Sequence, residues 1–397
     1  MPGLAQEVVM SQWIKLWFMS GVLFCASCAT QVESNITQTP STSVFRDDLF
    51  PSYMLSPVED SHTIFALSSE AQAFVDRTQS EIRTTRENIR NLVNQIFDHA
   101  ALGLSYQSAA NTNAATTFER GQANCLSLSV MTYAMAKYAG LSPQFYQVNI
   151  PEYWTRREGV NLLNGHINLR ISPHKNPNDI VFSEAFADVD FDPQEARNDF
   201  TREPISRKRV IAMFYNNKGA DALLGDSYST AYRYFKAAVN TDSTLSQAWV
   251  NLGVLYRRLD ENDSALASYQ RALKVNPNHL TAWENLSILY AATGRENEAQ
   301  KIQNRLARER QQNPFYHTML GEDALAAGKP TQALSHFRAA LRLDRRQHVI
   351  YFGLAKAYVA LGEDAKARTQ LVKAARLVPD ENLKARYQSK LSALQSS

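Results

Sequence analysis

The C-terminal half of the sequence repeats its apolar and small residues every 34 positions. One column holds Leu252, Leu286, Leu320 and Leu354, and a second holds Ala265, Ala299, Ala333 and Ala367. Glycine recurs midway between these columns, at Gly294, Gly328 and Gly362. A unit of this length accommodates two helices and the turn between them, so the pattern predicts an array of about five helix pairs over 212–380. An apolar stripe on the last polar stretch, 381–397, predicts a helix that caps the open end.

The columns carry a recognisable motif. The spacing W-x2-L-G-x2-Y is present as Trp249, Leu252, Gly253 and Tyr256. The array therefore resembles the tetratricopeptide-repeat family. The resemblance implies a superhelix whose concave face binds a peptide or a partner protein. The alternative is an intramolecular spacer that supports the preceding domain.

Between residues 45 and 209 the pattern changes from helical to alternating spacing. Residues 69–101 predict helix, and another helix begins at Cys125 and ends at Gly140. Four strands are then predicted, over 145–150, 166–171, 180–182 and 185–191. In the second of these, Ile167, Leu169 and Ile171 alternate with His166, Asn168 and Arg170. Helices followed by an antiparallel sheet predict an α+β domain.

The N-terminus has the pattern of a targeting segment. Residues 16–26 are apolar, follow Lys15 and are too short to span a bilayer, which indicates a signal peptide. Cys25-Ala26-Ser27-Cys28 resembles a bacterial lipobox, with Cys25 where leucine usually stands. That resemblance implies lipidation of Cys28 and a periplasm-facing outer-membrane lipoprotein. The alternative is a secretory signal that is cleaved near Ala29, and the chain starts at Met1 or Met10.

These patterns divide the sequence into five parts. They are a leader (1–28), a Ser/Thr-rich tether (29–44), the α+β domain (45–209), the repeats (212–380) and the capping helix (381–397).

Composition narrows the function. The 42 basic and 39 acidic residues give a net charge of +3, which does not support a nucleic-acid-binding protein. Three cysteines exclude a disulfide framework and a four-cysteine zinc site. With Cys28 lipidated or removed, Cys125 is the only thiol of the mature protein, because Cys25 belongs to the leader. We expect no cofactor.

Cys125 has the setting of a nucleophile. It opens a predicted helix, where backbone N–H groups and the helix dipole stabilise a thiolate. His166 lies on a later strand and Asp190 on another, which is the chain order of a Cys–His–Asp triad. Asp188 and Asp192 share the alternation of Asp190 and remain alternatives to it.

Three segments around these residues resemble the transglutaminase-like (papain-like) superfamily. They are 124–127 (NCLS), 165–168 (GHIN) and 189–193 (VDFDP). The resemblance implies that Cys125 attacks an acyl group, His166 moves the proton and Asp190 orients His166. The family pattern H-x-W/Y-x-E is not kept, since Asn168 and Arg170 replace its last two members. The substrate class is therefore open, as is the choice between hydrolysis and acyl transfer.

Two metal sites were weighed against this triad. Asp188, Asp190 and Asp192 resemble the start of a calcium loop, but Pro193 replaces the required glycine. Zinc bound by Cys125, His166 and His174 lacks the usual ligand spacing. The backbone N–H of Cys125, Gln122 and Asn124 are candidate oxyanion donors. Two functions are then expected: an envelope-anchored thiol hydrolase or acyltransferase, or a non-enzymatic repeat scaffold with a transglutaminase-like binding module.

Overall fold

A computed structural model describes most of the chain after residue 43. The described ranges are 44–103, 105–106, 110–149, 154–157, 160–163, 166–174, 186–191, 201–378 and 381–394. The predicted leader and lipidation site, with Cys28, lie outside them. Residues Val44–Ser397 form one compact unit.

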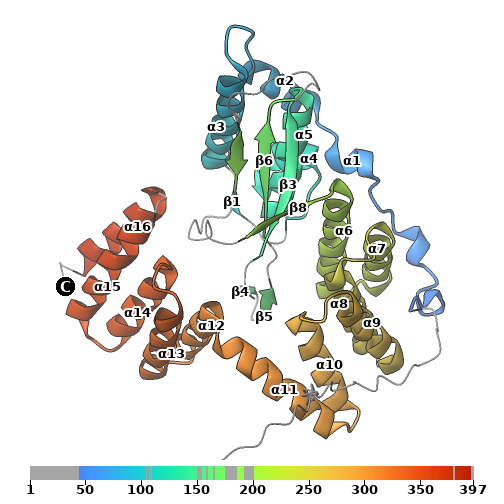
Figure 1. Cartoon of the computed structure of the whole chain (residues 1–397), viewed down its shortest axis with the longest axis vertical. Helices are drawn as coiled ribbons and strands as arrows, with labels where there is room; N and C mark the ends of the chain where they lie inside the picture. Colours follow the sequence, from blue (N-terminus) through green and yellow to red (C-terminus); the bar gives the residue numbers. More distant parts are fainter. Residues whose placement is uncertain are drawn as a thin grey trace, which may run out of the picture. The chain divides into compact units, whose positions relative to one another are not determined.

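The first part of this unit is an α/β region (Figure 1). Its helices are α1 (Ser61–Phe65), α2 (Ser69–Thr78), α3 (Thr85–Gly103), α4 (Ala114–Arg120) and α5 (Cys125–Tyr138). Its strands are β1 (Ser105–Tyr106), β2 (Gln122–Ala123), β3 (Ser142–Val148), β4 (Trp154–Arg157), β5 (Val160–Leu163), β6 (His166–Ser172), β7 (Ala187–Val189) and β8 (Arg202–Ile205). The prediction of helices followed by a sheet is confirmed at this level.

Helix was predicted over 69–101, and the structure has two helices there, α2 and α3. The chain breaks between them, where Ile82 is 98% exposed. A capping box starts the second helix: the Thr84 N–H donates to Glu87, and the Glu87 N–H donates to the Thr84 hydroxyl. Asn88 also exchanges two hydrogen bonds with the backbone of Ser80, which fixes the turn between the helices.

The main sheet has the strand order β7-β6-β3-β8, and each described pair is antiparallel. One face packs on α5 through Phe145, Leu169 and Val189, which are buried. The ring of Phe145 stacks on Tyr133 of α5 at 4.5 Å between centroids. Arg170 lies on the other face, where its guanidinium is 5.5 Å from the ring of Tyr146. The predicted strand at 180–182 lies outside the described residues.

Eleven helices follow within the described residues. They are α6 (Arg207–Leu224), α7 (Tyr228–Thr241), α8 (Ser246–Arg258), α9 (Asn262–Val275), α10 (Leu280–Ala292), α11 (Glu296–Gln311), α12 (Pro314–Ala326), α13 (Pro330–Leu343), α14 (His348–Ala360), α15 (Asp364–Leu377) and α16 (Glu381–Ala393). The first ten form five helix pairs, and α16 packs against α15. Helix α6 begins at Arg207, capped by the Ser206 hydroxyl, whereas the repeats were predicted from residue 212.

The turns within the five pairs share one backbone conformation. The residue at each turn has a positive φ, and these residues are Asp226, Asp260, Gly294, Gly328 and Gly362, each 34 positions after the last. Glycine adopts this conformation without the steric cost that other residues meet. The glycine column of the sequence therefore continues as aspartate in the first two pairs.

The buried side chains of the array form separate clusters. One cluster of buried side chains extends from Phe50 through the α/β region to Leu306 of α11. Two other clusters fill the pairs α12/α13 and α14/α15 and their contact with α16. The break falls between α11 and α12. In the first, second and fourth pairs a glycine of the first helix lies against an aromatic ring of the second, as Gly253 does against Tyr269. The same positions hold Ser287 and Gln303 in the third pair and Ala355 and Leu371 in the fifth.

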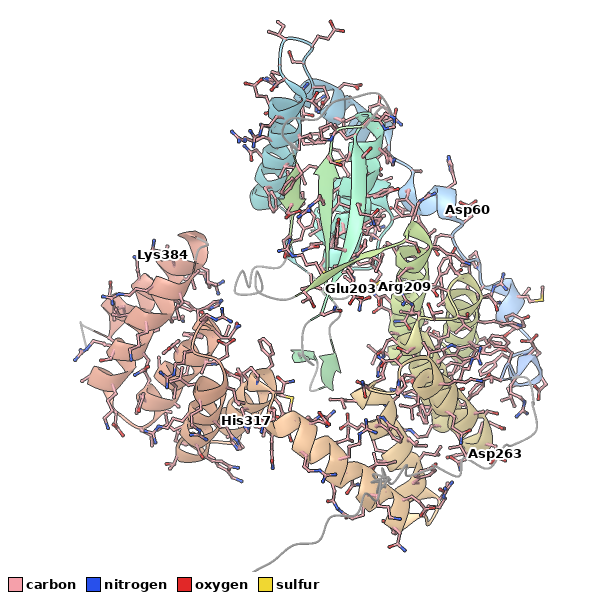
Figure 2. The ribbon with its side chains drawn as sticks, in the orientation of Figure 1. Asp60, Glu203, Arg209, Asp263, His317 and Lys384 are labelled. Atoms are coloured by element: carbon pink, nitrogen blue, oxygen red, sulfur yellow. The ribbon has the colours of Figure 1, made fainter. Side chains whose placement is uncertain are left out.

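Residues 44–60 precede α1 and lie along the first two helix pairs. We call them the N-terminal strap. The strap contains two short 3-10 helices, η1 (Asp47–Leu49) and η2 (Tyr53–Leu55), and it ends at Asp60, which caps α1 (Figure 2). Of the helices in the described ranges, none is both long and apolar enough to cross a membrane.

Candidate functional site

The candidate nucleophile Cys125 is the first residue of α5. The side chain of Asn124 caps this helix by accepting a hydrogen bond from the Ser127 N–H at 2.9 Å. Cys125 is half-buried and its thiol is free. The prediction that Cys125 opens a helix is therefore confirmed.

A short loop fixes the start of α5. The Ser127 hydroxyl donates to the Ala110 carbonyl at 3.1 Å and accepts from the Thr112 N–H at 3.0 Å. The Asn124 N–H donates to the same carbonyl at 3.3 Å. These bonds tie residues on both sides of Cys125 to a single loop and restrict the backbone there.

Two buried amides connect this helix start to the first repeat. Asn124 Nδ2 donates to Asn111 Oδ1, and Asn111 Nδ2 donates to Asp221 Oδ2 of α6, each at 2.5 Å. Asn111 and Asn124 are only 7% and 5% exposed. A hydrogen bond that ends on a carboxylate is stronger than one between neutral groups. Sequence analysis missed Asn111 and Asp221, because no local pattern marks a contact between residues 110 positions apart.

The elements that carry the predicted triad adjoin one another. Helix α5 packs against β6, whose first residue is His166, and β6 pairs with β7, which ends one residue before Asp190. The backbone of His166 is paired with Val148 of β3. The side chain of His166 lies outside the described part of the structure. Asp190 is half-buried.

The three alternating aspartates have different surroundings. Asp188 accepts two hydrogen bonds from Arg170, at 2.7 and 2.9 Å, and one from Arg202 at 3.3 Å. A carboxylate held by two guanidinium groups is engaged in a structural ion pair. Asp192 lies outside the described residues. The assignment of Asp190 as the third member of the triad stays a prediction.

The metal sites weighed from the sequence gain no support. No group of three or more His, Cys, Asp or Glu side chains in the described ranges is arranged to hold a metal ion. Asp192 and Pro193 of the calcium-loop pattern are outside those ranges.

A second candidate site is the surface formed by the first helices of successive repeats. Helices α6, α8 and α10 lie next to one another. Asn251 Nδ2 of α8 donates to Asn216 Oδ1 of α6 at 2.9 Å, and Gln247 Nε2 donates to Asn251 Oδ1 at 3.1 Å. On α10, Ile288 is 43% exposed. We call these four residues the first-helix face. Asn216 is only 7% exposed, so the face presents the half-buried amides of Gln247 and Asn251 and the apolar side chain of Ile288. These groups suit a peptide backbone and an apolar residue.

Comparison with known families identifies the array. Two models described as tetratricopeptide repeat match residues 246–279 and 324–394. The C-terminal part of the chain contains tetratricopeptide repeats. The sequence prediction of this family is thereby confirmed for the repeat region.

The relatives of the tetratricopeptide repeats are diverse proteins. The chain is 27% identical over 191 residues to Superkiller protein 3 of Schizosaccharomyces pombe, covering 45% of this chain and 13% of that protein. It is 26% identical over 167 residues to Protein O-mannosyl-transferase TMTC3 of Mus musculus, covering 38% and 18%. The chain thus spans less than a fifth of each of these two relatives.

Solved structures also match less than half of this chain, at low sequence identity. Pseudomonas aeruginosa pilF is 19% identical with a TM-score of 0.27, and 48% of this chain and 87% of that chain are covered. The Thermus thermophilus tetratricopeptide protein TTC0263 is 22% identical with a TM-score of 0.26, covering 45% and 98%. TM-scores this low carry no argument about function.

Proposed function

We propose that the chain is a scaffold protein that binds another protein through its tetratricopeptide repeats. The observation that carries this proposal is the first-helix face, which combines hydrogen-bonding amides with the exposed Ile288 on a repeat array of five helix pairs. Such arrays present extended surfaces to peptides and partner proteins. The α/β region then serves as a second binding module, joined to the first repeat through Asn111 and Asp221.

The test compares partner recovery by full-length variants. Ile288→Glu places a charge on the first-helix face without entering the core, so it should abolish recovery of the partner while leaving helical content unchanged. Ile82→Glu, outside the repeats and 98% exposed, is the matched control and should retain the partner. Cys125→Ala should retain it too. Equal recovery by Ile288→Glu and by the control would contradict the proposed surface.

The proposal includes attachment of the scaffold to the cell envelope through Cys28. Its support is the short apolar segment that ends in small residues and cysteine. Several acyl chains are needed for stable anchoring, since a single chain binds a membrane only marginally. Cys28→Ser should release the protein from the membrane fraction and remove the mass of the lipid. An unchanged mass and an unchanged fraction would contradict lipidation.

A second function, thiol acyl transfer, is favoured by the free half-buried thiol at the first position of α5. In this mechanism Cys125 attacks the acyl carbon, His166 accepts the thiol proton and returns it to the leaving group, and Asp190 orients His166. Arg170 lies on the sheet face away from α5, so the mechanism requires His166 to depart from the alternation of its strand.

Alkylation of the native chain by iodoacetamide distinguishes the two functions. If Cys125 and His166 act together, His166→Ala should slow alkylation by about tenfold or more, and Asp190→Ala should slow it less. The losses should not add, because the residues work as a unit. Equal alkylation rates in the wild type and in His166→Ala would rule out the triad and leave the scaffold.

A further inference from the structure

The N-terminal strap fills a groove on the first two repeats. The groove is formed by Tyr232 and Lys236 of α7, Tyr256 of α8, and Glu261 and Ser264 at the start of α9, and we call it the strap groove. Phe50 of the strap is 2% exposed, and its ring stacks on Tyr232 at 4.3 Å between centroids. Tyr232 and Tyr256 are completely buried beneath the strap and the repeats.

The ends of the groove carry opposite charges. Asp47 of the strap accepts hydrogen bonds from Lys236 Nζ at 2.5 Å and from the Tyr232 hydroxyl at 2.6 Å. These bonds lower the pKa of Asp47, and the bond to Lys236 has the larger effect. Next to it, Arg46 Nη1 donates to Glu261 Oε2 at 3.1 Å and to Ser264 Oγ at 3.3 Å. The groove thus distinguishes a basic residue from the acidic residue that follows it.

One hydroxyl group of the groove binds the backbone of the strap. The Tyr256 hydroxyl donates to the Val44 carbonyl at 2.8 Å and accepts from the Arg46 N–H at 3.2 Å. The Phe45 ring lies 6.0 Å from Trp249, nearly parallel to it. Main-chain bonds hold any extended peptide, and side-chain pockets select its residues. The strap is bound in the manner of a peptide ligand.

We propose that the strap groove is a peptide-binding site for an extended segment of the chemistry Phe-Arg-Asp-x-x-Phe, and that the strap is its intramolecular occupant. This site is formed by α7, the start of α9 and Tyr256 of α8, and it uses none of the residues of the first-helix face. A covalently linked ligand has an effective concentration in the millimolar range. A partner segment of the same chemistry therefore enters only when the strap is displaced.

A charge exchange between Asp47 and Lys236 tests the proposal in the full-length chain. The probe is a fluorescein-labelled peptide of residues 44–56, made with the natural sequence or with Asp47→Lys, and binding is followed by fluorescence anisotropy. The chain variants are Lys236→Asp, the double variant Asp47→Lys/Lys236→Asp, and the control Lys274→Asp. Lys274 is exposed on α9 and outside the groove.

In Lys236→Asp, Asp47 of the strap faces another carboxylate, which weakens binding of the strap. The Asp47→Lys peptide, whose lysine pairs with the new carboxylate, should then displace it. This chain should bind the Asp47→Lys peptide at least about tenfold more tightly than the natural peptide, because one restored charge pair is worth roughly a factor of ten. The double variant restores the pair within the chain and should exclude both peptides, as should the wild type. Lys274→Asp should behave as the wild type.

Three results would overturn the proposal: no peptide preference in Lys236→Asp, the same preference in Lys274→Asp, or binding to the double variant as strong as to the single one. Circular dichroism of the double variant reports whether position 236 tolerates the change. If Lys236→Asp does not fold, Phe50→Ala gives an independent measurement. It removes the buried ring of the strap, so it should admit the natural peptide at least tenfold more tightly than the wild type does, and equal affinity would overturn the proposal.

Discussion

At the scale of single residues, the glycine column predicted three of the five turn residues that have a positive φ. The glycine column predicted the turns at Gly294, Gly328 and Gly362, and the structure gives each a positive φ. Asp226 and Asp260 occupy the same turn with φ of 53° and 60°. They were not recognised from the sequence, because aspartate occurs in many backbone conformations and, unlike glycine, does not by itself indicate a positive φ.

These two aspartates lead to a stability prediction. Asp260→Gly should raise the free energy of unfolding by about 0.5–1 kcal/mol, because it relieves the left-handed conformation of a residue that bears a Cβ. Asp226→Gly should gain less, since the Asp226 carboxylate accepts hydrogen bonds from Arg258 and from the Tyr228 hydroxyl. Urea unfolding of the two variants measures the difference. A loss of stability in Asp260→Gly would show that its side chain is needed in the turn.

At the scale of elements, long periodic helices were predictable and short strands were not. The helix at Cys125 and the strand at His166 begin where the sequence indicated. Strand β8 (REPI) was missed, since it lacks apolar alternation and contains Pro204. Proline is tolerated there because β8 is the last strand of the sheet order. For the candidate site the sequence supplied Cys125 and Asn124, and it could not supply the buried amide of Asn111.

A buried histidine of α14 contacts helix α16. His348 of α14 is 2% exposed, and its Nδ1 lies 2.9 Å from the Tyr387 hydroxyl of α16. Burial lowers the pKa of His348 and raises that of Tyr387 to about 12. Below about pH 6.5 the unfolded chain binds a proton that the folded chain does not, so stability falls as the pH falls.

Hydrogen exchange of α16 at pH 7.5 and at pH 5.5 measures this effect. Exchange protection of α16 should decrease at pH 5.5, after correction for intrinsic rates, and His348→Gln should remove the difference between the two pH values. Tyr387→Phe should lower protection at both by about 1 kcal/mol and leave the pH dependence in place. Protection that is independent of pH in the wild type would show that His348 is not titrated on unfolding.

At the scale of the whole molecule, the division of the core predicts two cooperative units. The sequence indicated one uniform array, because the 34-residue spacing of its columns continues across the point where the buried clusters divide. Leu354→Ala, in the cluster of α12–α15, should loosen α12–α16 and leave α6–α9 protected. Leu252→Ala should loosen both the first repeats and the α/β region, because Leu252 belongs to the cluster that extends through both.

Each substitution should cost about 2–5 kcal/mol, as is usual for a buried leucine. Hydrogen exchange by mass spectrometry reports which helices lose protection. Equal loss along the whole array in Leu354→Ala would mean that the clusters are coupled more strongly than their packing implies.

The strap's distant contacts also affect the order in which the chain folds during synthesis. Its longest-range hydrogen bonds join residues 210 to 218 positions apart, from Arg46 to Tyr256 and Ser264. A ribosome that adds 5–20 residues per second needs roughly 10–40 s to complete this span. Throughout that interval Phe50 has no Tyr232 or Tyr256 to pack against, and its aromatic ring is available to chaperones. Closing so long a loop also slows folding. The N-terminal end of the described chain is therefore the first part synthesised and among the last to reach its native contacts.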